Sequence, residues 1–303
     1  MKAIDSFAGL GGFTLGAHGA GVRVVWAANH WRAAVETHIA NHPSVDHACQ
    51  DLHQAAWDQV PAHDLLLASP SCTGHTRARG REQKHHDAAR STAWAVVSCA
   101  EVHRPDVCVV ENVPEFRSWA LYPAWCAAMG ALGYSLAKHV IDAADHGVPQ
   151  NRVRLFVVAA RSLAPMKLTV PVLPQLAVSG ILDPDDTARW SQVYRRGRSA
   201  KTLRRVERGR EQHGGRFLVP YYGSTRGGRS VDRPIGTVTT VDRWALVDGD
   251  RMRMLSIGES RRAMGFPESY RLPKSHKLAL HMLGNAVCPP VVTLLLREIV
   301  ARG

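Results

Sequence analysis

Two short polar segments of this chain each follow an apolar run, and together they could carry out nucleophilic chemistry. Residues 69–72 (SPSC) and 111–113 (ENV) each come directly after four apolar residues. Short apolar runs are typical of buried strands in a parallel sheet, and the carboxyl ends of such strands share one edge. We therefore expect the Cys72 thiol and the Glu111 carboxyl group to face the same crevice. A nucleophile beside an acid suits attack on an electron-poor ring.

The elements that must position these groups follow from an alternation of strand and helix patterns over residues 1–161. Strands are expected at 2–6, 22–28, 64–68, 107–110, 135–141 and 154–159, and helices at 13–20, 31–41, 88–102 and 115–132. This alternation predicts an α/β fold with a Rossmann-like sheet. Prolines and basic residues break the pattern after Arg161, so a small irregular region is expected over 162–232. Helical patterning returns near residue 252 and includes a closing helix at 291–301.

The composition favours a polyanionic partner. The chain has 303 residues and a formal net charge of +12, and basic residues cluster at 77–84 and 195–210. Clustered positive charge is typical of proteins that bind nucleic acid. The six cysteines form no CxxC pair, which argues against structural zinc, and we expect no metal. No apolar run approaches the length of a membrane span and no signal peptide precedes the first strand, so we expect a cytoplasmic protein without a membrane partner.

A glycine-rich turn joins the first expected strand to the first helix. Residues 5–13 read DSFAGLGGF, and glycines there let the backbone approach a ligand and expose amide donors at a helix start. A dinucleotide-binding GxGxxG from Gly9 would need glycine at Thr14, so the hydride-transfer fingerprint fails. The turn suits a cofactor without a pyrophosphate, such as S-adenosylmethionine (SAM). Trp31 could stack on adenine or fill a core, and Asp51 could accept from the adenine amino group or cap a turn.

Six segments, in chain order and over nearly the whole length, resemble motifs of the DNA cytosine-5 methyltransferase family. They are DSFAGLGGF (5–13), ASPSCTGHT (68–76), ENV (111–113), GVPQNRVRLFVVA (147–159), RPIGTVTT (233–240) and GNAVCPPV (284–291). The second is similar to the catalytic loop usually written GGPPCQGFS, and the fourth to the QxRxR motif. The resemblance implies a SAM-dependent methyltransferase with three segments. These are a catalytic SAM-binding domain (1–161), a target-recognition region (162–232) and a C-terminal segment (233–303) that packs back and completes the SAM pocket.

The resemblance also implies a mechanism. The Cys72 thiolate would add to C6 of cytosine, Glu111 would assist at N3, and a methyl group would pass to C5 of a flipped-out base. Arg154 and Arg152 would hold the base O2 or a neighbouring phosphate. The implied cofactor residues are Phe7, Ala8, Gly9, Leu10, Gly11, Gly12, His30, Trp31, Asp51, Leu52, Ser71, Asn285 and Ala286. We expect a monomer of bacterial or phage type that binds double-stranded DNA of the nucleoid, with a separate restriction nuclease as a candidate companion.

Several positions depart from the family pattern. Ser71 and Thr73 flank the cysteine where the motif usually has Pro and Gln, and His75 replaces an aromatic residue. His30 stands where a glutamate usually binds the ribose hydroxyls, and histidine supplies no fixed negative charge there. The basic segment 77–84 is a candidate lid over the flipped base or a solvated loop. The small, arginine-rich recognition region predicts a short or relaxed target sequence.

Other functions stay open at this point. An RNA cytosine-5 methyltransferase of the same family, of the tRNA-modifying type, would be equally basic. A C5-modifying relative could use a modified SAM donor with an extra anionic group, because His30 replaces the usual acid. A non-catalytic nucleic-acid-binding relic is a third alternative, although Cys72 and Glu111 are intact. An amino-methyltransferase is disfavoured because its Asp/Asn-Pro-Pro-aromatic loop is absent.

Overall fold

The computed structural model describes residues 1–71, 91–184, 189–221 and 227–302, which form two compact units. Unit 1 comprises residues 1–143, 153–172 and 286–303, and unit 2 comprises residues 144–152 and 173–285. Each unit is thus built from segments that are separate in the chain, whereas the sequence suggested three consecutive segments. The functional roles assigned to those three segments stay predictions.

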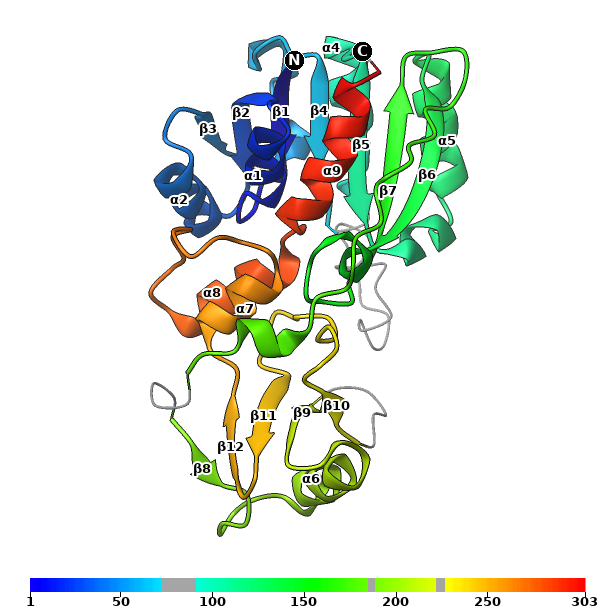
Figure 1. The fold of residues 1–303 in the computed structure, drawn as a ribbon. Coiled ribbons are helices and arrows are strands. Elements are labelled where there is room, and N and C mark those ends of the chain that lie inside the picture. Colours follow the sequence, from blue (N-terminus) through cyan, green and yellow to red (C-terminus); the bar gives the residue numbers. More distant parts are fainter. Residues whose placement is uncertain (72–90, 185–188, 222–226, 303) are drawn as a thin grey trace. The chain divides into compact units, whose positions relative to one another are not determined.

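Unit 1 contains a seven-stranded sheet in the order β3-β2-β1-β4-β5-β7-β6 (Figure 1). Its strands are β1 (Lys2–Ser6), β2 (Arg23–Asn29), β3 (Asp46–Cys49), β4 (Leu65–Ala68), β5 (Val107–Asn112), β6 (Ser135–Asp142) and β7 (Val153–Ala160). Strands β1 to β5 pair in parallel, and β7 runs antiparallel to both of its neighbours. β4 and β5 are buried along their whole length, as expected of central parallel strands. The predicted Rossmann-like α/β fold is confirmed.

Helices cover both faces of this sheet, with α1 and α9 on one face and α4 and α5 on the other (Figure 1). They are α1 (Gly12–Gly19), α2 (Arg32–Asn41), α4 (Trp94–His103), α5 (Tyr122–Ala131) and α9 (Pro289–Val300), with 3₁₀ turns η1 (Leu52–Gln54), η2 (Trp57–Gln59) and η4 (Pro114–Ser118). The single helix predicted over 115–132 is wrong, because η4 ends at Ser118 and α5 begins at Tyr122. Pro123 accounts for the break, since proline is tolerated in the first turn of a helix but not in its interior.

Glycines let α9 pack closely against α1, far away in the sequence. A Cβ atom on Gly16 would lie 2.5 Å from the Val292 Cβ, so only glycine fits this contact. Thr293 Oγ1 donates a hydrogen bond of 3.0 Å to the Gly16 carbonyl, and Arg297 Nη2 donates one of 3.0 Å to the Gly19 carbonyl. The last segment of the chain therefore completes the fold of unit 1.

Unit 2 contains a five-stranded antiparallel sheet in the order β10-β9-β11-β12-β8 (Figure 1). Its elements are η6 (Val178–Ile181), β8 (Ser191–Gln192), α6 (Ala200–His213), β9 (Arg216–Pro220), β10 (Arg229–Ser230), β11 (Trp244–Asp248), β12 (Arg251–Met254), α7 (Ile257–Ala263) and α8 (His276–Asn285), and η5 (Ala143–His146) leads into it. α6 packs against β9 around the buried Val206 and Phe217. This regular sheet differs from the irregular region expected over 162–232. Two of its strands are only two residues long, and two others come from beyond Asp232.

One stretch of the described chain, residues 276–300, is apolar and long enough to cross a membrane by length and composition alone. This finding corrects the expectation that no apolar run reaches that length. In the fold the stretch consists of two helices, α8 and α9, separated by residues 286–288, and most of it is buried. The apolar side chains of α9 face the core of unit 1, where Val292, Leu295 and Leu296 are buried.

Candidate active site

Glu111 and Arg154 form an ion pair on two neighbouring strands of unit 1. In the antiparallel pairing of β5 with β7, Glu111 lies opposite Phe156, so Arg154, two residues away, points to the same face. Arg154 Nε lies 3.1 Å from Glu111 Oε1, and the two side chains are 17% and 9% exposed. The guanidinium also donates from Nη1 to the Val153 carbonyl at 2.8 Å. The carboxylate is therefore held in a fixed orientation near the carboxyl end of β5.

The neighbouring Asn112 connects this strand end to the segment that leads into Cys72. Asn112 Nδ2 donates a hydrogen bond of 3.0 Å to the Pro70 carbonyl, and its Oδ1 accepts one of 2.9 Å from the Val113 amide. β4 and β5 pair in parallel, with Ala68 opposite Val110. Residues 69–71, the described part of the first polar segment, therefore lie at the same edge of the sheet as the second segment, 111–113.

The residues just before Cys72 are anchored from three sides. The Ser69 amide donates to the Ser6 carbonyl at 3.3 Å, and Ser69 Oγ donates to the Phe7 carbonyl at 3.3 Å. The Ser71 amide donates to Thr92 Oγ1 at 3.0 Å. Cys72 itself, Thr73, His75 and the basic segment 77–84 lie outside the described residues, so their roles stay predictions.

The glycine-rich turn has the open backbone that ligand binding requires. Phe7, Gly9 and Gly11 all have positive φ angles, of 65°, 54° and 92°. The turn is closed by a hydrogen bond of 2.8 Å from the Gly11 amide to the Ala8 carbonyl. Among the described residues, a Cβ atom on Gly9 would come within 4 Å of only the Phe7 carbonyl oxygen, at 3.7 Å. The described part of the chain therefore leaves room for a ligand to approach the backbone at Gly9.

Two other positions of the glycine-rich turn, Leu10 and Gly12, contact the rest of unit 1. A Cβ atom on Gly12 would lie 2.2 Å from the Val287 carbonyl oxygen, so Gly12 accommodates the returning chain. Leu10 is buried in the core. Ala286, the predicted cofactor residue next to Val287, is also buried and belongs to unit 1, whereas Asn285 belongs to unit 2.

The remaining predicted cofactor residues follow the carboxyl ends of β2 and β3. The Trp31 amide donates to Asn29 Oδ1 at 2.9 Å, and the half-buried Trp31 immediately precedes α2. His30 is exposed. Asp51 is also exposed and accepts a hydrogen bond of 3.0 Å from the His53 amide, while Leu52 is buried. Because β1, β2 and β3 are parallel, these residues and the glycine-rich turn share one edge of the sheet.

Arg152 has a different environment from the one predicted. It lies in unit 2 and is 3% exposed, and its guanidinium donates to the Val238 carbonyl at 3.2 Å and to the Gly284 carbonyl at 2.8 Å. Gln150 also binds the backbone of Val238, because its Oε1 accepts a hydrogen bond of 2.7 Å from the Val238 amide. Its guanidinium is therefore buried against backbone carbonyls, while the contact of Arg152 with a base or phosphate stays a prediction.

A buried hydrogen-bonded chain behind the glycine-rich turn was not predicted. Thr14 donates to Asp5 Oδ2 from its amide at 3.1 Å and from Oγ1 at 2.7 Å, and Thr14 Oγ1 lies 3.1 Å from His38 Nε2. His38 Nδ1 in turn lies 2.7 Å from His47 Nε2. Burial raises the pKa of Asp5 to about 7, although the Thr14 hydrogen bonds oppose this shift. Burial, followed by the nearby His42 and other histidines, lowers the pKa of His38 to about 2, so His38 is neutral at physiological pH.

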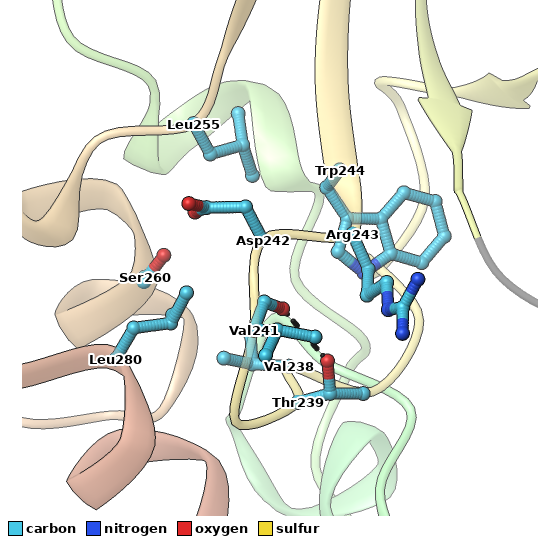
Figure 2. A pocket seen from close by; sticks show the side chains of 9 residues that line it. All are labelled: Val238, Thr239, Val241, Asp242, Arg243, Trp244, Leu255, Ser260 and Leu280. Atoms are coloured by element: carbon cyan, nitrogen blue, oxygen red, sulfur yellow. Dashed lines mark hydrogen bonds between the residues drawn. The ribbon is translucent and has the colours of Figure 1, made fainter. Parts of the chain in front are cut away.

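A small pocket lies in unit 2 near Val238 and is open to solvent (Figure 2). Figure 2 shows the Asp242 side chain turned toward Ser260 and Leu255, whereas Arg243 and Trp244 point the other way. Asp242 also lies 3.0 Å from His276 Nε2. The predicted site residues that the structure describes are not among those lining this pocket.

Comparison with known proteins agrees with this fold. The chain is 27% identical over 301 residues to the Type II methyltransferase M.NlaX of Neisseria lactamica, covering 96% of this chain and 94% of that one. It is 27% identical over 305 residues to the Type II methyltransferase M.HhaI of Haemophilus parahaemolyticus, with 95% and 90% covered. A solved structure of a protein encoded within an E. coli prophage has a TM-score of 0.74 at 18% identity and covers 99% of each chain, which supports the fold alone.

A family model carries the assignment. The sequence model described as C-5 cytosine-specific DNA methylase matches residues 1–183 and 183–301, which together make up nearly the whole chain. The segments with family-like motifs fall inside these matches, including those that carry Glu111 and Arg154. The chain therefore belongs to the C-5 cytosine-specific DNA methylase family.

Proposed function

We propose that this chain transfers a methyl group to C5 of cytosine in DNA, with Cys72 as the nucleophile and Glu111 as the acid at ring N3. One observation carries the proposal. The buried Glu111, oriented by Arg154 at 3.1 Å, is joined through Asn112 and Pro70 to the segment that leads into Cys72. A thiol nucleophile and an oriented carboxyl group are the two groups that activation of cytosine requires.

The chemistry follows from the weak nucleophilicity of cytosine C5. The Cys72 thiolate adds to C6, which forms a carbon–sulfur bond and moves electron density toward N3. Glu111 donates a proton or hydrogen bond at N3 and so stabilises the charge that develops there. C5 is then an enamine-like carbon that can accept a methyl cation equivalent. A base afterwards removes the C5 proton, and the electron pair of that bond expels the Cys72 thiolate.

The residues at the edge of unit 1 fit SAM as the methyl donor. The open backbone at Gly9 admits a ligand, the half-buried Trp31 offers an aromatic face, and the exposed Asp51 offers a carboxylate acceptor. Phe7, Ala8 and Gly11 would hold the amino-acid end, while Leu10, Gly12 and Leu52 support the backbone around it. SAM, when bound, supplies an electrophilic methyl group. With histidine at position 30 the ribose hydroxyls would be held by a hydrogen bond from a neutral or cationic ring rather than by a carboxylate.

Double-stranded DNA is the proposed substrate, and it must present its base flipped out. The relatives M.NlaX and M.HhaI carry the name Type II methyltransferase, which favours DNA over RNA. Exposed basic residues between 195 and 208 of unit 2 would supply affinity for phosphates, so the target would be short. A cytoplasmic monomer that works beside a separate restriction nuclease remains part of this proposal.

Trapping on 5-fluorocytosine tests the mechanism without knowledge of the target sequence. The native protein, SAM and a duplex in which every cytosine is 5-fluorocytosine should give a covalent adduct on a denaturing gel, because fluorine cannot leave C5 as a proton does. Cys72→Ser should abolish the adduct, and Cys49→Ser, at an exposed cysteine, should keep it. No adduct from native protein that binds SAM would refute the mechanism. An adduct with RNA of the same sequence, but not with DNA, would establish the RNA alternative instead.

A further inference from the structure

A hydrogen bond links Ser71, the last described residue before Cys72, to Thr92, the second described residue after segment 72–90. The Ser71 amide donates to Thr92 Oγ1 at 3.0 Å, and both residues are half-buried. Ser71 immediately precedes Cys72, whereas Thr92 lies 21 residues further along the chain. This contact therefore fixes the backbone beside the nucleophile from a distant part of the sequence.

The peptide group between Pro70 and Ser71 is held at both of its ends. Its carbonyl accepts from Asn112 Nδ2 at 3.0 Å, and its N–H donates to Thr92 Oγ1 at 3.0 Å. Because a peptide group is planar and rigid, two hydrogen bonds at its opposite ends fix its orientation as well as its position. The last described peptide group before Cys72 is therefore fixed by these two hydrogen bonds.

Thr92 is itself firmly supported. Its carbonyl accepts from the Ala95 amide at 3.2 Å, where the chain turns into α4. The next residue, Ala93, is buried, and its carbonyl accepts a hydrogen bond of 2.9 Å from the indole N–H of the fully buried Trp125. The backbone that carries the Thr92 hydroxyl is therefore fixed by hydrogen bonds to the core of unit 1.

The contact exists because residue 71 is not a proline. A proline there would lock its own φ angle near −65° but would have no N–H to donate. Serine has the opposite properties, since its φ angle is free and its N–H is available. The hydrogen bond from Ser71 to Thr92 can thus restrain the backbone at residue 71 in place of a proline ring.

We propose that Thr92 is a positioning residue for the Cys72 nucleophile and acts through the Ser71 amide. This inference rests on the proposed role of Cys72. It predicts that Thr92 matters only while residue 71 carries an N–H.

A double-mutant cycle tests this dependence. The variants are Thr92→Val, which has the same shape without the hydroxyl, Thr92→Ser, which keeps it, Ser71→Pro, and the double variant Ser71→Pro/Thr92→Val. The measurement is the single-turnover rate of adduct formation on 5-fluorocytosine duplex with SAM, across a range of duplex concentrations. Thermal unfolding of each variant accompanies it, so that a folding defect is recognised.

Thr92→Val should lower the rate at saturating duplex about tenfold, the size expected for loss of one hydrogen bond, and leave the half-saturating duplex concentration unchanged. Thr92→Ser should restore most of the rate. In the Ser71→Pro background, adding Thr92→Val should cause no further loss. An equal loss in both backgrounds, or no loss in Thr92→Val alone, would overturn the positioning role while leaving Cys72 as the nucleophile. Absence of an adduct with the native protein would overturn both proposals.

Discussion

Two arginines of one motif, Arg152 and Arg154, serve the two units of this molecule in different ways. Arg154 lies on β7 of unit 1 and orients the Glu111 carboxylate at 3.1 Å, with 17% of its side chain exposed. Arg152 lies in unit 2, is almost fully buried, and donates to the Val238 and Gly284 carbonyls. The same side chain two positions apart thus meets a carboxylate in one unit and backbone carbonyls in the other.

The difference shows that a motif can combine chemistry with architecture. Arg152 and Gln150 together hold both the carbonyl and the amide of Val238, so they fix a backbone segment rather than a substrate. A Cβ atom on Gly284 would lie 2.4 Å from the Thr239 and Thr240 backbone, which shows how tightly this segment packs. Parts of three segments with family-like motifs therefore meet within unit 2 for structural reasons: residues 150–152, 238–240 and 284.

The largest expected effect lies on the chemical side of this comparison. Glu111→Gln keeps the shape of the side chain but removes the acidic proton, so we expect methyl transfer to slow by about 100- to 10,000-fold. Transfer of labelled methyl groups from SAM to DNA in a single turnover measures this rate. Glu101→Gln, at an exposed position on α4, is the matched control and should keep the native rate. A Glu111→Gln rate within threefold of the native one would remove Glu111 from the mechanism.

The next effect lies on the architectural side. Arg152→Met leaves two buried carbonyls without their donor, so we expect the free energy of unfolding to fall by about 3 kcal/mol. Arg154→Met should cost less stability, because that side chain is less buried, but should slow methyl transfer more. Urea unfolding and single-turnover rates of both variants measure the two quantities. If the two variants gave the same pattern, the division of labour between the arginines would be disproved.

A smaller effect concerns a third buried polar group, which is held neutral rather than charged. The pKa of His38 is lowered to about 2 in the fold from an ordinary value of 6.5, so its stabilising contribution is present above pH 6.5 and is lost as the pH falls. Between pH 7 and pH 5 this loss amounts to about 2 kcal/mol. Asp5 acts in the opposite direction. Because its pKa is raised to about 7 in the fold, its contribution to stability is greatest when the pH is below its ordinary pKa of 3.8.

His38→Gln should therefore lose less stability than the native protein when the pH is lowered from 7 to 5. Urea unfolding at the two pH values measures the difference, and His213→Gln, at an exposed position at the end of α6, serves as the control. The neighbouring histidines His18, His42 and His47 are present in both proteins, so their effect on the pH dependence of stability cancels in this comparison. A variant as acid-sensitive as the native protein would show that His38 does not stay neutral.

Much of unit 1 could be predicted from the sequence because its strands are short apolar runs beside glycine-rich turns. The strand expected at 107–110 was found at 107–112, so Glu111 and Asn112 belong to the strand itself. The single helix expected over 115–132 was wrong, because the helical pattern of the sequence continues across the break between η4 and α5, where Pro123 lies in the first turn of α5. The sheet of unit 2 was not predicted, because the burial of β12 (RMRM) does not follow its alternation, with Arg253 buried and Met254 exposed, and because β8 and β10 are too short to produce a pattern.

The candidate site was predictable only where a motif marks it. Glu111 and Arg154 were found through motifs, and the structure brings them together. The burial of Arg152 was not predicted, because a motif does not reveal whether a side chain is buried, and its assigned role stays a prediction. Thr92 and His38 were missed because their partners, Ser71 and Thr14, lie 21 and 24 residues away and no local pattern encodes such contacts.

The packing of α9 on the glycines of α1 has a consequence for the synthesis of the chain. The ribosome makes α1 long before α9, yet the two helices need each other to bury their facing sides. Unit 2 lies between them in the sequence and can complete its sheet while still attached to the ribosome. Helix α1 thus reaches its final environment only after α9 has been made, and until then its glycine face is a surface for a chaperone to protect.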